Sequence, residues 1–304
     1  MRILMTGGTG LLGNALGRRL ARSHQLLVLS REGKAARSRI SYPCEVVGWD
    51  TKSELNNRVL EGVEGVIHLA GENIAKGRWT AERKQALRDS RIQPLEQLGK
   101  ALQANGRQLK ILVSASGVGF YGDRKAEELT EDSQPGSGFL PELCVEWENA
   151  ARAVNARRTV MLRLGVVLSH EGGFLSEVMR MFRRFGAARL GSGQQYLSWI
   201  HADDVVEIVA QALLNPSLSG PINAVAPAAV NNADFTKKLA VLTKSHRIPL
   251  APGFILRMMY GEMADLLLWS QKVKPDRLLK LKWNFRYADL DKALSSALTT
   301  TPTK

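Results

Sequence analysis

Three glycines near the N-terminus have a spacing that suits phosphate binding. The segment TGGTGLLG (6–13) places Gly7, Gly10 and Gly13 at G-x-x-G-x-x-G spacing, between an apolar run and a stretch with helical periodicity. In that context Gly7 allows a tight turn, Gly10 lets backbone approach a pyrophosphate, and Gly13 lets the helix pack closely. Free N–H groups at the helix N-terminus favour phosphate. The segment therefore predicts a dinucleotide site, with a glycine-rich turn that binds nothing as the alternative. The residues expected there are Thr6, Gly7, Gly10, Leu11, Leu12 and Gly13.

The end of the second apolar run indicates which dinucleotide is bound. Sites selective for NAD usually carry an acidic residue here, which accepts a hydrogen bond from the ribose 2′-hydroxyl. This chain has Ser30 and Arg31, followed by Lys34 and Arg37. A guanidinium binds a 2′-phosphate with two charge-assisted hydrogen bonds. We therefore predict NADP(H) as the cofactor, with Arg31 as the main contact and Ser30 beside it; a solvated basic turn is the alternative.

Further polar residues follow the third and fourth apolar runs. Asp50 ends the third run and is expected either at the adenine or in a plain turn. The HLAG turn (68–71) is expected beside the cofactor through Leu69, Ala70 and Gly71. Glu72 follows it and would suit a base if buried. Arg78 and Trp79 suit an anionic or planar substrate, and equally a structural ion pair and a core tryptophan.

Short apolar runs alternate with helical stretches, which is typical of a parallel sheet wrapped by helices. The fold class expected is α/β, a Rossmann-type doubly wound parallel sheet with a smaller, mainly helical C-terminal lobe. Residues 80–103 predict a long helix with a kink or break at Pro94. Other helices are expected at 11–23 and within 199–214, the latter beginning near Asp203 and Asp204. Strands are expected at 2–7, 26–30, 44–50, 65–71, 110–117, 159–169 and 220–227.

Beyond residue 227 the pattern becomes mainly helical, which suggests a second unit. We assign residues 1–169 and 199–227 to an NADP-binding Rossmann domain. Residues 170–198 and 228–298 then form a substrate or lid lobe over the open end of the sheet, where such folds bind ligands. Residues 299–304, TTTPTK, are expected to be a disordered tail.

Composition limits the class of protein further. No run approaches the ~18–20 apolar residues of a membrane span, and no secretory signal precedes the first strand. Two cysteines and five scattered histidines predict no disulfide framework and no metal site. The net charge of +13 suits a phosphorylated cofactor, and no nucleic-acid module accompanies it. We expect a cytoplasmic protein that binds a small molecule, with no nucleic-acid partner and no membrane.

Several segments resemble the extended short-chain dehydrogenases/reductases. They are TGGTGLLG (6–13), HLAG (68–71), VSASGVGFYGD (113–123), RLGVVLS (163–169) and WIHADDVV (199–206). The chain more closely resembles the atypical branch called "epimerase family protein". The segments that indicate this are GENIAKGRWTAERKQALRDSRI (71–92), LCVEWENAA (143–151), LGSGQQYLSWIH (190–201) and LRMMYGEMADLLLWSQKVKPDRLL (256–279). The resemblance implies a Rossmann domain, NADP binding and a C-terminal domain of unassigned function, and it supplies no substrate.

The resemblance also implies a catalytic tyrosine and lysine at i and i+4 of one helix, and this chain lacks the pair. Counting from WENAA (147–151) places Leu140 and Cys144 at the two positions. Tyr121 and Lys125 match the spacing, but Gly122 and Asp123 argue against a helix there.

Two residues remain as candidates for the chemistry. Ser116, or less favourably Ser114, would orient the substrate oxygen or merely cap the strand, and Tyr121 would point into the cleft mouth and act as a substitute acid. Glu142 and Glu146 are expected on a solvated or partner-facing helix side. Cys144 is expected as a small buried hydrophobe.

We therefore expect an NADP(H)-binding oxidoreductase or a nucleotide-sugar-epimerase-like enzyme of unassigned substrate. The alternative is a non-catalytic NADP(H)-binding redox sensor or partner-binding protein. His201 is expected to be structural.

Overall fold

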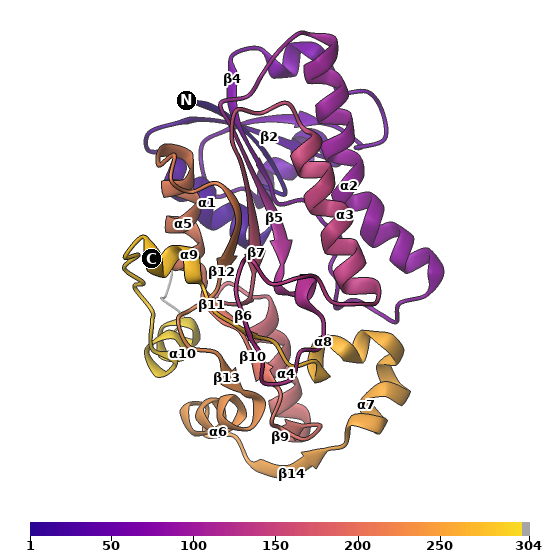
Figure 1. Ribbon diagram of the computed structural model, residues 1–304, viewed down its shortest axis with the longest axis vertical. Helices are drawn as coiled ribbons and strands as arrows, with labels where there is room; N and C mark the ends of the chain where they lie inside the picture. The colour runs from indigo at the N-terminus through magenta and orange to yellow at the C-terminus, as the bar shows by residue number, and fades with distance from the viewer. Residues whose placement is uncertain (300–304) are drawn as a thin grey trace.

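A computed structural model describes residues 1–299 and contains a seven-stranded parallel sheet (Figure 1). The strand order is β12-β7-β5-β4-β1-β2-β3, which reverses direction beside β1, as in doubly wound folds. The fold class expected from the sequence is thus confirmed. The strands are β1 (Arg2–Thr6), β2 (Gln25–Ser30), β3 (Glu45–Gly48), β4 (Val63–His68), β5 (Ile111–Gly117), β7 (Thr159–Leu164) and β12 (Gly220–Ala224).

Helices cover both faces of this sheet, and consecutive strand residues contribute to opposite layers of core. Ile3 and Met5 of β1 pack with the layer beneath α1 and α5, whereas Leu4 packs with the layer beneath α2 and α3 (Figure 1). Burial on both faces explains why the strands read as continuous apolar runs. The helices are α1 (Leu11–Leu20), α2 (Ala81–Ala104), α3 (Phe139–Ala153) and α5 (Ala202–Leu214). Short 3₁₀ turns are η1 (Gly33–Arg39), η2 (Asn57–Leu60) and η3 (Val118–Tyr121).

Two predicted elements differ from the structure. Helix α2 continues through Pro94 as one element, so of the predicted kink or break the break is wrong. Pro94 lacks the N–H of a regular turn. The single strand predicted at 159–169 divides at Gly165. A Cβ at Gly165 would lie 2.7 Å from the carbonyl oxygen of Ser198. Beyond this close contact, β8 (Val166–Leu168) leaves the main sheet and pairs with β11 (Trp199–His201).

Most of the remaining elements gather below the sheet in Figure 1, and they are mainly helical. Part of this C-terminal region joins the main core, because Leu278 and Phe285 pack with the layer beneath α1 and α5. A short strand from each region also pairs, β6 (Glu128–Leu129) with β15 (Lys272–Val273). The helices are α4 (Phe174–Phe185), α6 (Asn232–Leu242), α7 (Gly253–Tyr260), η4 (Gly261–Ala264), α8 (Asp265–Leu268), α9 (Asp276–Lys280) and α10 (Leu290–Leu298). The other strands are β9 (Ala187–Leu190), β10 (Tyr196–Leu197), β13 (Val230–Asn231) and β14 (Arg247–Ala251).

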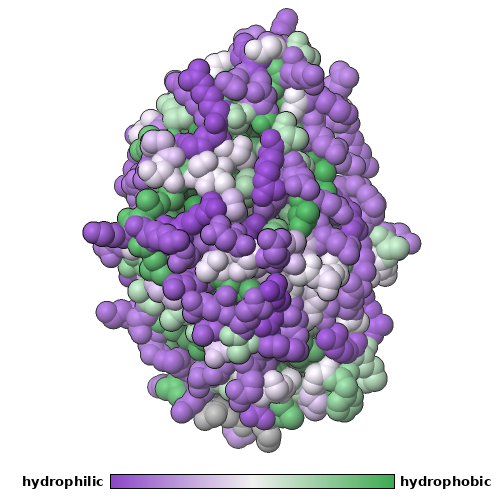
Figure 2. Space-filling model, viewed as in Figure 1, coloured by the Kyte–Doolittle hydropathy of each residue, from purple (hydrophilic) through white to green (hydrophobic). Residues whose placement is uncertain are grey.

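The face seen in Figure 2 is mostly hydrophilic, with hydrophobic side chains scattered among the polar ones. Among residues 1–299, no helix is long and apolar enough to cross a membrane. The tail expected to be disordered falls, from residue 300 onward, outside the described residues.

Candidate functional site

The glycine loop between β1 and α1 is shaped by close backbone contacts. Gly7 has φ +73°, and a Cβ there would lie 2.7 Å from the carbonyl of Leu69. A Cβ on Gly13 would clash with the carbonyl oxygen of Gly7. Helix α1 begins after Gly10, which offers no side-chain cap, and its first turn has no acidic residue. The first-turn N–H groups of α1 are thus left for an external acceptor, which favours a phosphate.

Two adjoining cavities lie on either side of this loop. The β2-side cavity, of about 260 Å³, lies near the ends of β1, β2 and β4. The β5-side cavity, of about 480 Å³, lies near the ends of β1, β5 and β7. Both are lined by the loop and the HLAG turn, through Gly7, Gly10, Leu69, Ala70 and Gly71. A ligand long enough to cross the loop would therefore occupy both.

Most residues predicted to bind the cofactor line one of these cavities. Thr6, Ser30 and Arg31 line the β2-side cavity together with the predicted substrate residue Glu72. Leu11, Leu12 and Gly13 line the β5-side cavity. Asp50 lines neither, because its carboxylate accepts hydrogen bonds from Lys52 N, Ser53 N and Ser53 Oγ within its own turn. These contacts describe the plain turn aspartate rather than an adenine contact.

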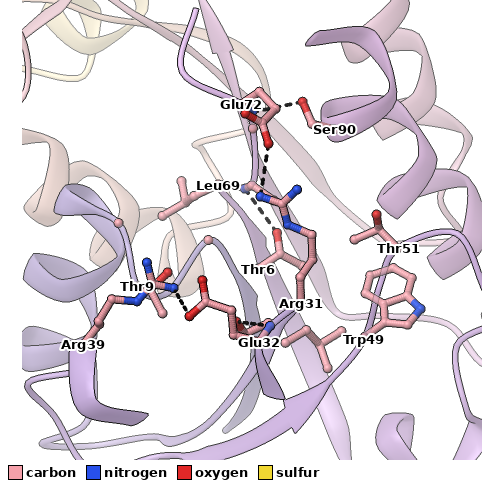
Figure 3. A pocket seen from close by; sticks show the side chains of 16 residues that line it. Thr6, Thr9, Arg31, Glu32, Arg39, Trp49, Thr51, Leu69, Glu72 and Ser90 are labelled. Atoms are coloured by element: carbon pink, nitrogen blue, oxygen red, sulfur yellow. Dashed lines mark hydrogen bonds and ion pairs between the residues drawn. The ribbon is translucent and has the colours of Figure 1, made fainter. Parts of the chain in front are cut away.

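An ion pair crosses the β2-side cavity (Figure 3). Arg31 Nη2 lies 3.1 Å from Glu72 Oε1, and Arg83 Nη1 lies 3.4 Å from Glu72 Oε2. Burial raises the pKa of Glu72, but the two guanidiniums outweigh burial and lower it overall. Glu72 is therefore ionised at neutral pH, and it lines the β2-side cavity rather than the β5-side one. This position argues against the predicted role of Glu72 as a base.

The basic segment after β2 contains one residue that the sequence reasoning missed. Arg39 lines the β2-side cavity and lies 2.7 Å from Glu32 (Figure 3). Arg37 instead donates to the carbonyls of Ile40 and Tyr42, at 3.1 and 2.9 Å, so its role is structural. Spacing along an irregular 3₁₀ turn does not show which of its arginines faces inward.

Thr6 is positioned by a buried histidine on the neighbouring strand. Thr6 Oγ1 lies 2.8 Å from His68 Nδ1, and His68 Nε2 lies 2.9 Å from the carbonyl of Arg91. A carbonyl only accepts, so Nε2 carries the proton and Thr6 donates to Nδ1. Burial lowers the pKa of His68 to about 4, which keeps the ring neutral. Thr6 Oγ1 also accepts from Ala70 N at 3.3 Å and thereby joins the loop to the HLAG turn.

At the β5-side cavity, Ser116 belongs to a buried ionic network. Ser116 Oγ donates to Glu148 Oε1 at 3.0 Å, and the same carboxylate accepts from Arg163 Nε at 2.8 Å and Nη2 at 3.0 Å. Because the Ser116 proton is directed to Glu148, the free lone pairs of Oγ suit a donor on a ligand. Ser114 is fully buried, donates to the carbonyl of Ala115 and does not line the cavity. The sequence offered no signal for Glu148 or Arg163, because ionised residues are rarely buried.

Tyr121 does not point into the cleft mouth, so that prediction is wrong. Its side chain is fully buried, its hydroxyl donates to Asn223 Oδ1 at 2.7 Å, and it accepts from Arg163 Nη1 at 2.9 Å. Burial raises the pKa of Tyr121 to about 12. The phenol finds both of its polar partners inside the protein, and its packing turns it away from the cavity.

Arg78 and Trp79 also lie outside both cavities, which contradicts their predicted contact with substrate. Arg78 donates to the carbonyls of Met258 and Met259 at the end of α7. Trp79 Nε1 donates to the carbonyl of Ile74 at 2.9 Å, and its ring packs edge-on against Phe139. Both residues therefore have structural roles. Trp79 is a core tryptophan, and Arg78 bonds to backbone carbonyls rather than to the acidic group of an ion pair.

Leu140 and Cys144, which stand where the resemblance implies tyrosine and lysine, both line the β5-side cavity. Burial and the nearby Glu148 carboxylate raise the pKa of Cys144 to about 11, so it stays a neutral thiol. The expectation of a small buried hydrophobe at this position is confirmed.

His201, Glu142 and Glu146 all have partners within the fold, and the side chains of the two glutamates are partly exposed on their helix, as expected of a solvated side. His201 caps α5 by accepting from Asp203 N, which confirms its structural role. Glu142 and Glu146 both pair with Arg88 of α2, at 3.6 and 2.9 Å.

Strand order, glycine loop and paired cavities together define a Rossmann-type α/β protein with two adjoining cavities at the carboxyl ends of the strands. Residues 3–225 match the NAD dependent epimerase/dehydratase family, and residues 251–297 match a domain of unknown function called DUF1731. The chain belongs to the NAD dependent epimerase/dehydratase family.

Related proteins span nearly the same length. "Epimerase family protein Mb2239" of Mycobacterium bovis is 38% identical over 302 residues, which are 98% of this chain and 97% of the relative. The crystal structure of human epimerase family protein SDR39U1 with NADPH superposes with a TM-score of 0.84 at 31% identity, over 98% of this chain and 99% of that one. A nucleoside-diphosphate sugar epimerase from Corynebacterium glutamicum is 33% identical, with a TM-score of 0.77 over 98% of this chain and 58% of that one.

Proposed function

We propose that this protein is an NADP(H)-dependent oxidoreductase or an epimerase-like enzyme that acts on a small molecule without a Tyr-x-x-x-Lys pair. The observation that supports it best is the arrangement of the two cavities. One glycine loop separates a cavity with two arginines, Arg31 and Arg39, from a cavity with Ser116. A relative of 31% identity has been solved with NADPH, which supports the same cofactor here.

The residues present fit this cofactor. The uncapped first turn of α1 would bind the diphosphate through backbone N–H groups. Arg31 and Arg39 would bind the 2′-phosphate, Arg31 after release from Glu72. The nicotinamide half would lie in the β5-side cavity and supply or accept a hydride when bound.

The chain itself would orient the reacting oxygen and exclude water. Ser116 directs its proton to Glu148, so its oxygen would accept a hydrogen bond from a substrate hydroxyl. Leu140 and Cys144 contribute no group that ionises near neutral pH, so a proton released at Ser116 would pass to water or to Glu148. The two free cysteines are compatible with a reducing, cytoplasmic compartment.

The experiment uses NADPH deuterated at the transferable C4 position of the nicotinamide. Purified protein is incubated with this cofactor and a fractionated metabolite extract, and products are searched by mass spectrometry for the label. Label in one small molecule would identify a reductase and its substrate together. Chromatography of isomers in the same extract covers an epimerase that returns the hydride to the same molecule. If no labelled product forms and no isomers are exchanged, the proposal is contradicted.

A non-catalytic NADP(H)-binding redox sensor or partner-binding protein is the second candidate. The observation that favours it is that the apolar Leu140 and the neutral Cys144 line the cavity where an acid and a cation would act. Affinity capture in the presence of NADPH or NADP⁺ would test it. A partner retained with only one of the two cofactors would support the sensor, whereas identical capture with both would contradict it.

A further inference from the structure

Arg91 of α2 is a buried cation without an acidic partner among residues 1–299. Of the arginines whose side chains the structure describes, two are less than a tenth exposed, Arg91 at 8% and Arg163 at 3%. Arg163 is neutralised by both carboxylate oxygens of Glu148. Arg91 donates instead to the carbonyls of Leu87 and Glu72, each at 3.0 Å, and to Ser90 Oγ at 3.3 Å. A buried charge is costly unless it is paired, so a negatively charged ligand would stabilise Arg91.

The guanidinium of Arg91 faces space that a side chain at position 71 would fill. A Cβ on Gly71 would lie 3.1 Å from Arg91 Cζ, 3.2 Å from Nη2 and 3.4 Å from Nε. These distances place the Cβ over the flat face of the guanidinium, and Nη2 donates to the carbonyl of Glu72. Arg91 Nε donates to no atom of the described residues, and Arg91 lines the β5-side cavity. The Nε–H of Arg91 is therefore left to donate to an oxygen of a carboxylate or a phosphate.

Trp147 of α3 carries a second polar group near Arg91. Its indole Nε1–H is buried without a hydrogen-bond partner among the described residues, and its ring lies 5.2 Å from the Arg91 guanidinium carbon. Trp147 also lines the β5-side cavity and is 8% exposed. A buried N–H left unpaired is costly, so an acceptor on a ligand would stabilise this position.

The remaining walls of the β5-side cavity leave the charge of Arg91 uncompensated. Asp265, an acidic residue on the wall, is paired with Arg257 at 2.8 Å. Burial lowers the pKa of Arg91 to about 10, so it remains protonated at neutral pH. Apolar side chains form much of the surface, namely Ile74, Leu140, Leu143, Leu164, Leu266 and Trp269.

We propose that Arg91, with the Trp147 indole, binds an anionic group of the substrate. The substrate is then a small molecule that carries a carboxylate or a phosphate beside an apolar or planar body. Its size is limited because the cavity of about 480 Å³ must also hold half of the cofactor. This inference rests on the proposed function, since it concerns the substrate of the same cavity. The diphosphate of the cofactor is also an anion that Arg91 could bind, so the test must distinguish binding of the substrate from binding of the cofactor.

The test measures the binding of benzoate and phenyl phosphate to NADPH-saturated protein by calorimetry, with neutral benzamide for comparison. We expect the wild type to bind either anion, Arg91→Met to bind it at least about tenfold more weakly, and benzamide to bind weakly to both. Arg88→Met is the matched control. It removes a cation one turn earlier on α2, which pairs with Glu146 and does not line the cavity. Its anion affinity should equal that of the wild type.

The NADPH affinity of each variant shows whether Arg91 binds the anionic group of the substrate or the diphosphate of the cofactor. Unchanged NADPH affinity in Arg91→Met, together with lost anion binding, supports the inference. A matching loss of NADPH affinity would assign Arg91 to the cofactor and overturn it, as would equal anion binding in Arg91→Met or none in the wild type. If Arg91→Met does not fold, Arg91→Lys keeps the charge without the guanidinium Nε–H and should bind the anions more weakly than wild type. A wild type that binds no NADPH would instead contradict the proposed function. Titration of the anions into the protein without cofactor would then still show whether Arg91 binds them.

Discussion

The guanidinium of Arg31 lies 3.1 Å from the carboxylate of Glu72, and this ion pair joins the end of β2 to the segment after β4 (Figure 3). The pair crosses the cavity in which a 2′-phosphate is expected. Glu72 therefore holds Arg31 over the cavity and also competes with the phosphate for it. Two predictions concern these two residues.

Replacing Arg31 should reduce the preference for the phosphorylated cofactor. Arg31→Ala removes a guanidinium that would bind the 2′-phosphate, so NADPH affinity should fall about tenfold while NADH affinity changes little. Fluorescence titration with both cofactors measures the ratio. Lys34→Ala is the control, because Lys34 is exposed in the same segment and does not line the cavity. An unchanged ratio in Arg31→Ala would show that another group reads the phosphate.

Replacing Glu72 should have the opposite effect. Glu72→Gln keeps the shape of the side chain but removes the charge that competes for Arg31. NADPH affinity should rise about two- to fivefold, since partly exposed ion pairs contribute up to about 1 kcal/mol. The same titration measures it. Weaker binding in Glu72→Gln would mean that the ion pair orders Arg31 for the phosphate rather than withholding it.

Ser116 and Tyr121 should behave differently. Ser116→Ala removes a hydroxyl that lines the β5-side cavity and should lower turnover by about 100-fold or more. Tyr121→Phe removes a hydroxyl buried against Asn223 and Arg163, so it should lower stability by about 1–3 kcal/mol and leave turnover nearly unchanged. NADPH oxidation with the substrate found by deuterium transfer, together with thermal unfolding, measures both. Lost turnover in a stable Tyr121→Phe protein would restore the phenol as a catalytic group.

The buried pair of Glu148 and Arg163 should dominate the stability of this region. Arg163→Met leaves the Glu148 carboxylate without its main partner and should cost about 3–5 kcal/mol in the free energy of unfolding. Arg152 donates to the same carboxylate at 3.0 Å from a side chain that is 47% exposed. Arg152→Met should therefore cost no more than about 1 kcal/mol. Urea denaturation compares the two, and equal losses would refute the distinction between a buried and an exposed partner.

His68 should make the protein less stable in mild acid. Burial lowers the pKa of His68 to about 4 in the folded state, from the ordinary value of 6.5 that a histidine has in an unfolded chain. Between pH 4 and pH 6.5 the unfolded chain binds more protons than the folded protein, so the free energy of unfolding decreases as the pH falls. The folded protein should lose up to about 3 kcal/mol from this residue between pH 6.5 and 4. Urea melts of wild type and His68→Gln at about pH 7 and about pH 4.5 measure the loss on either side of the unfolded-state pKa. Parallel losses in both proteins would contradict the assignment.

Local sequence patterns accounted for the strands and the glycine loop. The central strands, such as β1 and β5, are buried on both faces, so continuous apolar runs marked them correctly. The run at 159–169 was the exception, because the contact between Gly165 and Ser198 that ends β7 comes from a distant segment of the chain. Pro94 likewise failed as a break signal, since α2 continues past it.

The positions of the reactive side chains could not be predicted in the same way. Tyr121 bonds to Asn223, which is 102 positions away in sequence, and Arg31 pairs with Glu72 on another strand connection. Such contacts depend on how the helices and strands pack, so the residues next to Tyr121 and Arg31 in the sequence do not indicate them.

The sequence by itself determined the doubly wound sheet, the phosphate-binding loop and the absence of a Tyr-x-x-x-Lys pair from the helix that contains WENAA (147–151). These depend on backbone geometry and on periodicity over a few residues, which the order of residues encodes directly. Only the tertiary structure decided that Ser116 bonds to Glu148, that Tyr121 is withdrawn from the cavity, and that Arg91 is buried among carbonyl and hydroxyl partners. Burial and pairing of polar groups depend on the whole packed chain, because each buried charge takes its partner from wherever the fold provides one.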